Sequence, residues 1–82
     1  MRSQIRGRAV NRPPNVATVL VDTAANQLGE FRGVMGPYWT LRPVGGGIEW
    51  EVRPTQLRLA DPAERLRAET ALANARSRGE VL

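Results

Sequence analysis

The side chains in this sequence that could do chemistry are arginines, carboxylates, hydroxyls and four aromatic residues. There is no histidine, the most common general base and metal ligand, and no cysteine to form a thiolate or a disulfide. All twelve basic residues are arginine, so Ser3, Ser77 and the threonines also lack a lysine that could activate them as nucleophiles. We therefore expect a protein that is not an enzyme and that uses no cofactor and no metal.

Two local patterns resemble chemical sites but have simpler explanations. Glu49 and Glu51 lie two residues apart, so their carboxylates would share one face of a strand and could bind a cation or transfer protons. Arg42 and Arg53 are expected on that same face, which favours salt bridges. The glycines at 45–47 lack the helix and the lysine of a phosphate-binding loop, which favours a hairpin turn.

The aromatic residues suggest a binding surface. Phe31, Trp39 and Trp50 are expected in the core, whereas Tyr38 should point to the opposite side of its strand. An exposed tyrosine among arginines can recognise a peptide or stack on a nucleic-acid base. The candidate partner-binding residues are Tyr38, Arg32, Thr40 and Arg42.

The positive charge is concentrated at the N-terminus. The whole chain carries a formal charge of +4, and residues 13–82 contain equal numbers of arginines and acidic residues. The alternative hypothesis of nucleic-acid binding therefore rests on the first twelve residues, with help from the surface of the folded part. The arginines of this arm are Arg2, Arg6, Arg8 and Arg12.

The hydrophobic pattern predicts a mainly β fold. Five short apolar segments separated by turn residues indicate a small five-stranded barrel of SH3-like shape. Gly29 and Gly33 lie within the second segment, where glycine often marks a bulge or a sharp bend. A single turn of 3₁₀ helix is expected near Pro54. The predicted strands are residues 16–21, 28–34, 38–44, 47–53 and 57–59.

The third and fourth segments predict a hairpin with a defined register. A turn at Gly45-Gly46 supplies the positive φ angles of a tight hairpin, and a four-residue loop would keep the same alignment of side chains. The expected inward pairs are Trp39 with Val52 and Leu41 with Trp50, and the expected outward pairs are Thr40 with Glu51 and Arg42 with Glu49.

A helix is expected after the strands. Asp61, Pro62 and Glu64 form a capping box with proline at the first helical position, and Gly79 supplies a stop signal. The apolar face of this helix is thin, so it either docks on the barrel or meets a partner. The residues expected on this apolar face are Ala63, Leu66 and Ala73. The predicted organisation is a disordered basic arm over 1–15, a barrel over 16–60 and a C-terminal helix over 61–79.

The order of several short motifs resembles a group of short, uncharacterised actinobacterial proteins of Streptomyces type. The motifs are Gly29-Glu30, Gly36-Pro37-Tyr38, Leu41-Arg42-Pro43, the glycines at 45–47, and Glu49-Trp50-Glu51-Val52. The resemblance covers residues 19–80 and implies a shared fold but no activity. The strand order is also similar to that of SH3-like barrels and their ribosome-linked KOW relatives, which is a similarity of shape.

The partner and the location follow from these expectations. We expect a non-enzymatic module that binds another protein, or that self-associates through the C-terminal helix, as a regulatory accessory protein. Nucleic acid remains the alternative partner. No apolar run approaches the length needed to cross a bilayer, so we expect no membrane partner and a cytoplasmic location.

Overall fold

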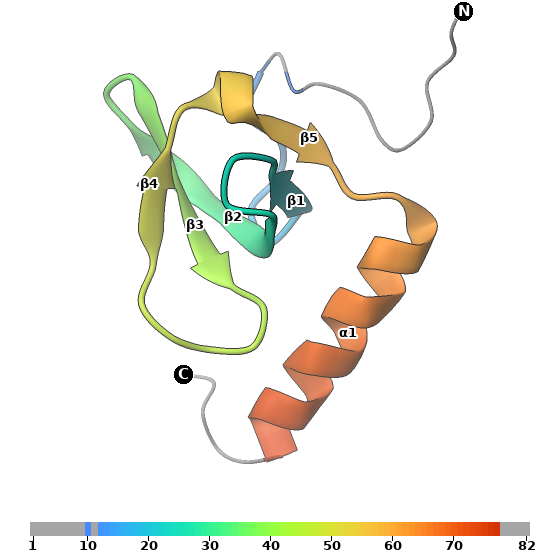
Figure 1. Cartoon of the computed structure of the whole chain (residues 1–82). Coiled ribbons are helices and arrows are strands. Elements are labelled where there is room, and N and C mark those ends of the chain that lie inside the picture. The colour runs from blue at the N-terminus through green and yellow to red at the C-terminus, as the bar shows by residue number, and fades with distance from the viewer. Residues whose placement is uncertain (1–9, 11, 78–82) are drawn as a thin grey trace, which may run out of the picture.

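The computed structural model describes residues 10 and 12–77. These residues form one antiparallel sheet followed by a helix, so the predicted mainly β class with a C-terminal helix is confirmed (Figure 1). In chain order the elements are β1 (Val19–Asp22), β2 (Gln27–Met35), β3 (Tyr38–Pro43), β4 (Trp50–Val52), the 3₁₀ turn η1 (Pro54–Gln56), β5 (Leu57–Leu59) and α1 (Pro62–Ser77).

The five strands follow the order β4-β3-β2-β1-β5 in the sheet. The first four strands form a meander of successive antiparallel neighbours. The fifth strand then returns across the sheet and pairs with β1, where Leu20 lies opposite Leu59. η1 makes this return possible, because Gln56 accepts hydrogen bonds from the backbone and the hydroxyl of Thr23, beyond the end of β1.

The sheet does not close into a barrel. In the part of the chain that the structure describes, β4 and β5 are the two edges of the sheet and no ladder joins them. Each has only three residues, and η1 occupies the segment between them. The sheet therefore remains open, because the chain between Val52 and Leu57 turns instead of extending a strand across the gap.

The starts of β1 and β4 each differ from the prediction by three residues. β1 starts three residues later, because Thr18 donates to the Asn15 carbonyl and Ala17 has a positive φ of 77°, which makes a turn. The expected two-residue turn at Gly45-Gly46 was wrong as well. Gly46 donates to the Pro43 carbonyl, and residues 44–49 form a longer loop before β4.

The register of the β3–β4 hairpin was predicted correctly despite the longer loop. Trp39 pairs with Val52, Thr40 with Glu51, and Leu41 with Trp50. The inward side chains build the main core, in which Trp50 is only partly buried and packs against the other members. The buried members are Leu20, Phe31, Trp39, Leu41, Val52 and Leu57.

The aromatic pair at the centre of this core has a defined geometry. The rings of Phe31 and Trp39 lie 5.3 Å apart between centroids at an interplanar angle of 70°, an edge-to-face contact. Such pairs add about 0.5–1.5 kcal/mol beyond the area that they bury. The Phe31 N–H donates to the Thr18 carbonyl, and the Phe31 carbonyl accepts from the Ala17 N–H, so the segment ahead of β1 holds Phe31 in place.

The two strand glycines have different roles. The ladder between β2 and β3 shifts between Phe31 and Gly33, so Arg32 is the extra residue of a bulge. Gly29 lies under Trp50, and a Cβ at this position would lie 2.7 Å from Cη2 of that indole. Gly29 is therefore needed for close approach, whereas the expected local distortion occurs beside Gly33.

The helix begins as the sequence predicts. Asp61 Oδ1 accepts from the Glu64 backbone N–H at 2.8 Å, and Glu64 Oε1 accepts from the Asp61 backbone N–H at 2.9 Å. These reciprocal bonds form the capping box. From there α1 runs down one side of the sheet from the end of β5 (Figure 1).

The buried face of α1 is not the expected one. Its buried residues are Glu64, Ala68 and Ala75, whereas Ala63, Leu66 and Ala73 are exposed. The arrangement has a physical reason, because small alanine side chains let the helix approach the sheet closely.

A second, smaller apolar layer lies under the helix. Val21 pairs with Leu28, and both side chains lie on the sheet face opposite Leu20 and the main core. The helix therefore covers one end of the outer sheet face and leaves the β3–β4 end uncovered.

Candidate functional site

The predicted binding residues share the uncovered outer face of the sheet. Tyr38, Thr40 and Arg42 alternate with the core residues of β3, so their side chains leave the sheet on the side away from Trp39 and Leu41. Arg32 at the bulge lines a shallow hollow of about 220 Å³ with Thr40. The structure thus brings Arg32, Thr40 and Arg42 to one surface.

A single carboxylate joins the two arginines of this surface. Glu49 Oε2 lies 3.6 Å from Arg32 Nε and 3.7 Å from Arg42 Nε. The predicted Arg42–Glu49 partnership is therefore present, although Glu49 lies in the loop and not in a strand. All three side chains are partly exposed, so each contact contributes no more than about 1 kcal/mol.

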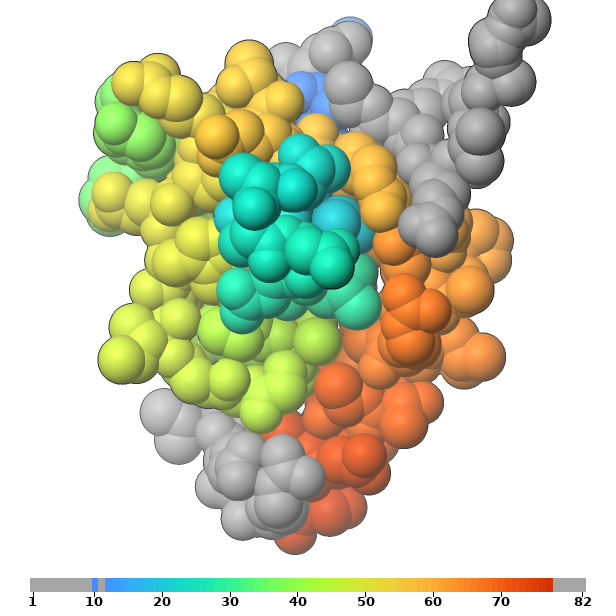
Figure 2. All heavy atoms as spheres, viewed as in Figure 1, coloured from blue at the N-terminus to red at the C-terminus, as the bar shows by residue number. Residues whose placement is uncertain are grey.

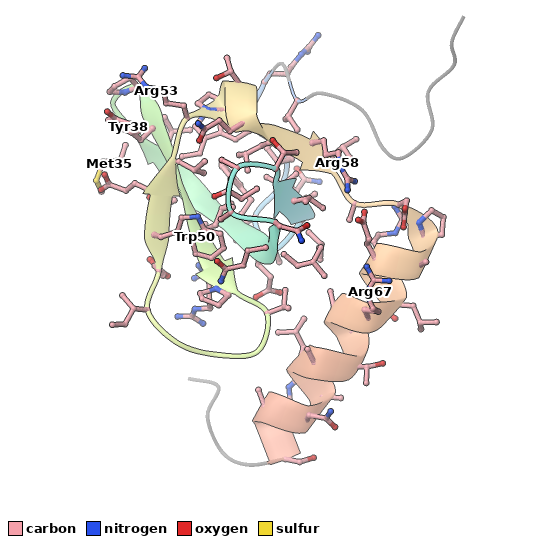
Figure 3. All side chains as sticks on the ribbon, viewed as in Figure 1. Met35, Tyr38, Trp50, Arg53, Arg58 and Arg67 are labelled. Atoms are coloured by element: carbon pink, nitrogen blue, oxygen red, sulfur yellow. The ribbon has the colours of Figure 1, made fainter. Side chains whose placement is uncertain are left out.

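Tyr38 has a different arginine partner. The Arg53 guanidinium lies 5.0 Å from the centroid of the Tyr38 ring, and its Nη2 donates a long hydrogen bond of 3.4 Å to the Tyr38 hydroxyl. Met35 lies opposite Tyr38 in the ladder and is 57% exposed. Figure 3 shows Met35, Tyr38 and Arg53 together at one end of the sheet. Met35, Tyr38 and Arg53 form what we call the hairpin patch.

The sequence reasoning missed Arg53 as a binding candidate. Arg53 follows β4 directly. The sequence pattern favoured a salt bridge between Arg53 and a glutamate on the same face of the strand. Among the described residues no carboxylate forms an ion pair with Arg53. The predicted register of the β3–β4 hairpin already indicates that these two residues are neighbours, because the pair of Trp39 and Val52 places Tyr38 beside Arg53.

Asp22 is a buried carboxylate with a structural role. Its Oδ2 accepts from the indole Nε1–H of Trp50 at 2.9 Å, and its Oδ1 accepts from the backbone N–H groups of Ala24 and Ala25. These bonds tie the β1–β2 turn to β4. Both carboxylate oxygens of the buried Asp22 are therefore hydrogen-bonded within the protein, which is typical of a structural role.

Glu64 is the second buried acidic residue, and Arg58 of β5 binds it with both ends of the guanidinium. Nη1 donates to Oε1 and Nη2 to Oε2, each at 2.8 Å, and the Glu64 side chain is only 7% exposed. Hydrogen bonding to Glu64 raises the pKa of Arg58, while burial opposes the rise. Arg58 thus stays charged and joins the last strand to the start of the helix.

A groove separates the helix from the sheet, and we call it the helix–sheet groove. It has a volume of about 520 Å³ and lies between the β1–β2 turn, the loop after β3 and the first turns of α1. The space-filling view shows these three segments next to one another (Figure 2). Apolar side chains line its sheet side, and Glu64 and Arg67 line its helix side.

The arm residues are largely outside the described part of the chain. Arg12 is exposed, and Arg2, Arg6 and Arg8, which the alternative hypothesis assigns to nucleic-acid binding, lie outside the described residues. Within residues 10 and 12–77, no group of three or more acidic side chains is arranged to hold a metal ion. No helix within the same residues has the length and apolar character needed to cross a membrane.

Comparisons of the chain with protein-family models, with curated proteins and with solved structures found no match. The resemblance to short actinobacterial proteins therefore stays a prediction from the sequence motifs. Any function must be argued from the surfaces described above.

Proposed function

We propose that this chain is a non-enzymatic module that binds another protein through the hairpin patch. The observation that carries the proposal is Arg53 stacked over Tyr38 beside the exposed side chain of Met35. Tyrosine, methionine and arginine are enriched at protein interfaces, and tyrosine and arginine are frequent among the residues that dominate binding energy.

The internal contacts of the patch support this role. Because Arg53 lies against the Tyr38 ring, two long side chains are held near one geometry before a partner arrives, which lowers the entropy lost on binding. The predicted surface of Arg32, Thr40 and Arg42 continues the same sheet face and would supply a polar rim. Glu49 already neutralises part of its charge.

The architecture also supports an SH3-like interpretation, as a partly open barrel. The meander, the bulge in β2, the 3₁₀ turn and the return of β5 to β1 all agree with such a fold. A fold of this type does not fix a function, so the interaction surface carries the proposal.

Site-specific photo-crosslinking tests the proposal in the full chain. We would replace the exposed Met35 with p-benzoylphenylalanine in cells that make the protein and identify crosslinked proteins by mass spectrometry. A matched control carries the same analogue at the exposed helical residue Glu69. The proposal expects a discrete partner at position 35 that is weak or absent at position 69.

The partner would then be purified for affinity measurements. Arg53→Ala should weaken its binding by at least about 1 kcal/mol, roughly fivefold. Equal crosslinking from both positions, or unchanged affinity in the Arg53 variant, would contradict a binding role for the patch.

Self-association through α1 is a weaker form of the proposal. Leu66 is 64% exposed on the helix, but among the described helical residues the other exposed neighbours are small or polar. Stable interfaces bury about 1,200–2,000 Å² in total, more than one leucine can supply. Light scattering should show a monomer at micromolar concentration, and a dimer that Leu66→Ser dissociates would favour the helix instead.

Nucleic-acid binding through the arm remains the second candidate, because residues 1–12 hold four arginines and no acidic residue. Fluorescence anisotropy with duplex DNA tests it across a salt series. Each phosphate contact should contribute about −0.9 to the slope of log affinity against log salt, and removal of residues 1–12 should abolish the binding. Absence of binding at low salt excludes this candidate.

A further inference from the structure

The helix–sheet groove offers a ligand site that is separate from the hairpin patch. Val21 and Leu28 are paired in the sheet and form its floor with Val44, and Val21 and Val44 are buried. The helix contributes Glu64 and Arg67 to the opposite wall. A volume of about 520 Å³ lies within the range of ligand pockets, about 300–1,000 Å³.

Among the described residues, the groove lining includes one positive charge without an ion pair. Glu64 lines it, but Arg58 and the Asp61 backbone N–H already bind that carboxylate. Arg67 lies nearly one helical turn further on, also lines the groove and is exposed, with no ion pair among the described residues. Figure 3 shows Arg67 on α1 and Arg58 at β5. A carboxylate is therefore the complementary group for this end of the groove.

The remaining rim consists of amide groups. Asn26 and Gln27 line the groove from the β1–β2 turn, and carboxamides both donate and accept hydrogen bonds, as a peptide backbone requires. We propose that the helix–sheet groove binds the C-terminal end of a peptide, with an apolar last side chain over Val21 and Leu28 and its carboxylate at Arg67. A C-terminal carboxylate suits this groove, because it is attached to the same Cα as the last side chain and can reach Arg67 while that side chain covers Val21 and Leu28.

Titration of the ¹⁵N-labelled full chain tests the proposal by NMR. The probe is an acetylated tripeptide, Ala-Leu-Leu, with a free carboxylate, compared with the same peptide as a C-terminal amide and with N-acetyl-leucine. We expect saturable shifts at Gln27, Gly45, Gly46 and Arg67 with millimolar affinity for the free tripeptide. The amide should bind about fivefold more weakly, which corresponds to about 1 kcal/mol for an exposed ion pair.

Two substitutions on the helix make the test specific. Arg67→Gln should weaken the free tripeptide about fivefold and leave the amide unchanged, whereas Arg76→Gln, in the last turn of the same helix, should change neither. Equal binding of acid and amide, shifts outside the groove, or no saturable shift would overturn the proposal. Equal binding of N-acetyl-leucine and the tripeptide would show that the site takes a small carboxylic acid and not a peptide end.

Discussion

At the residue scale, the sequence predicts that the two tryptophans pack on one face of the sheet. It does not predict why a glycine, Gly29, is needed beneath Trp50. Alternation along two strands is enough to place Trp39 and Trp50 on one face, because a slip of one residue would expose them. The role of Gly29 depends on which side chain crosses above it in the folded sheet. Local sequence does not contain that information.

Gly29→Ala is expected to destabilise the protein by about 1–3 kcal/mol, as overpacking in a core does. The added Cβ would lie 2.7 Å from Trp50 Cη2 and 3.1 Å from Leu41 Cβ, and Leu41 is fully buried. Urea unfolding followed by tryptophan fluorescence measures the change. The control is Gly33→Ala in the same strand, where a Cβ meets no atom within 4 Å. That variant should lie within about 0.5 kcal/mol of the parent protein.

Asp22→Asn is expected to lower stability by about 1–3 kcal/mol. An asparagine can keep its carbonyl oxygen for the turn amides, but it then presents an N–H₂ donor to the indole N–H of Trp50. The Trp50 Nε1–H resonance should move strongly in NMR spectra, and the Trp39 resonance should move little. A double-mutant cycle with Trp50→Phe isolates the pair, and a coupling energy near zero would contradict the assignment.

At the scale of elements, capping chemistry predicts where the helix begins but not which side it buries. The capping box is a local pattern of three residues, so it can be read directly from the sequence. The expected face assumed that Leu66 would point inward. Instead, Arg58 holds Glu64 against the sheet, and this strand–helix pair fixes the helix so that the alanines follow inward.

Arg58→Met should therefore affect the helix before it affects the sheet. The substitution keeps much of the apolar stem but removes the paired hydrogen bonds to the nearly buried Glu64, at a cost of about 1–3 kcal/mol. Hydrogen exchange should accelerate most in the first turns of α1, while the amides of Phe31 and Leu41 change less. Arg76→Met is the control, with an expected change of no more than about 0.5 kcal/mol. Uniform acceleration across all strands would show that the pair does not act locally.

At the scale of the whole molecule, the number of strands and their order along the chain could be predicted, and closure of the sheet could not. Turn residues divide the chain into five short strands with little ambiguity. Closure depends on whether β4 and β5 extend far enough to meet, and each has only three residues. At the candidate site, Tyr38 was selected from its strand face, and the same predicted register already places Arg53 of the β4 end beside it.

The molecule contains two apolar layers of unequal strength, and this predicts two levels of local stability. The main core holds an edge-to-face aromatic pair and fully buried leucines, whereas the layer under α1 depends on alanines, Val21 and a salt-bridged glutamate. The helix should therefore open separately from the sheet. Native-state hydrogen exchange at low denaturant measures the free energy of the opening that exposes each amide. For Ala71 and Leu72 this free energy should be about 1–3 kcal/mol lower than for Phe31 and Leu41. Identical opening energies in both groups would mean that sheet and helix form one cooperative unit, and the groove between them would then be as rigid as the core.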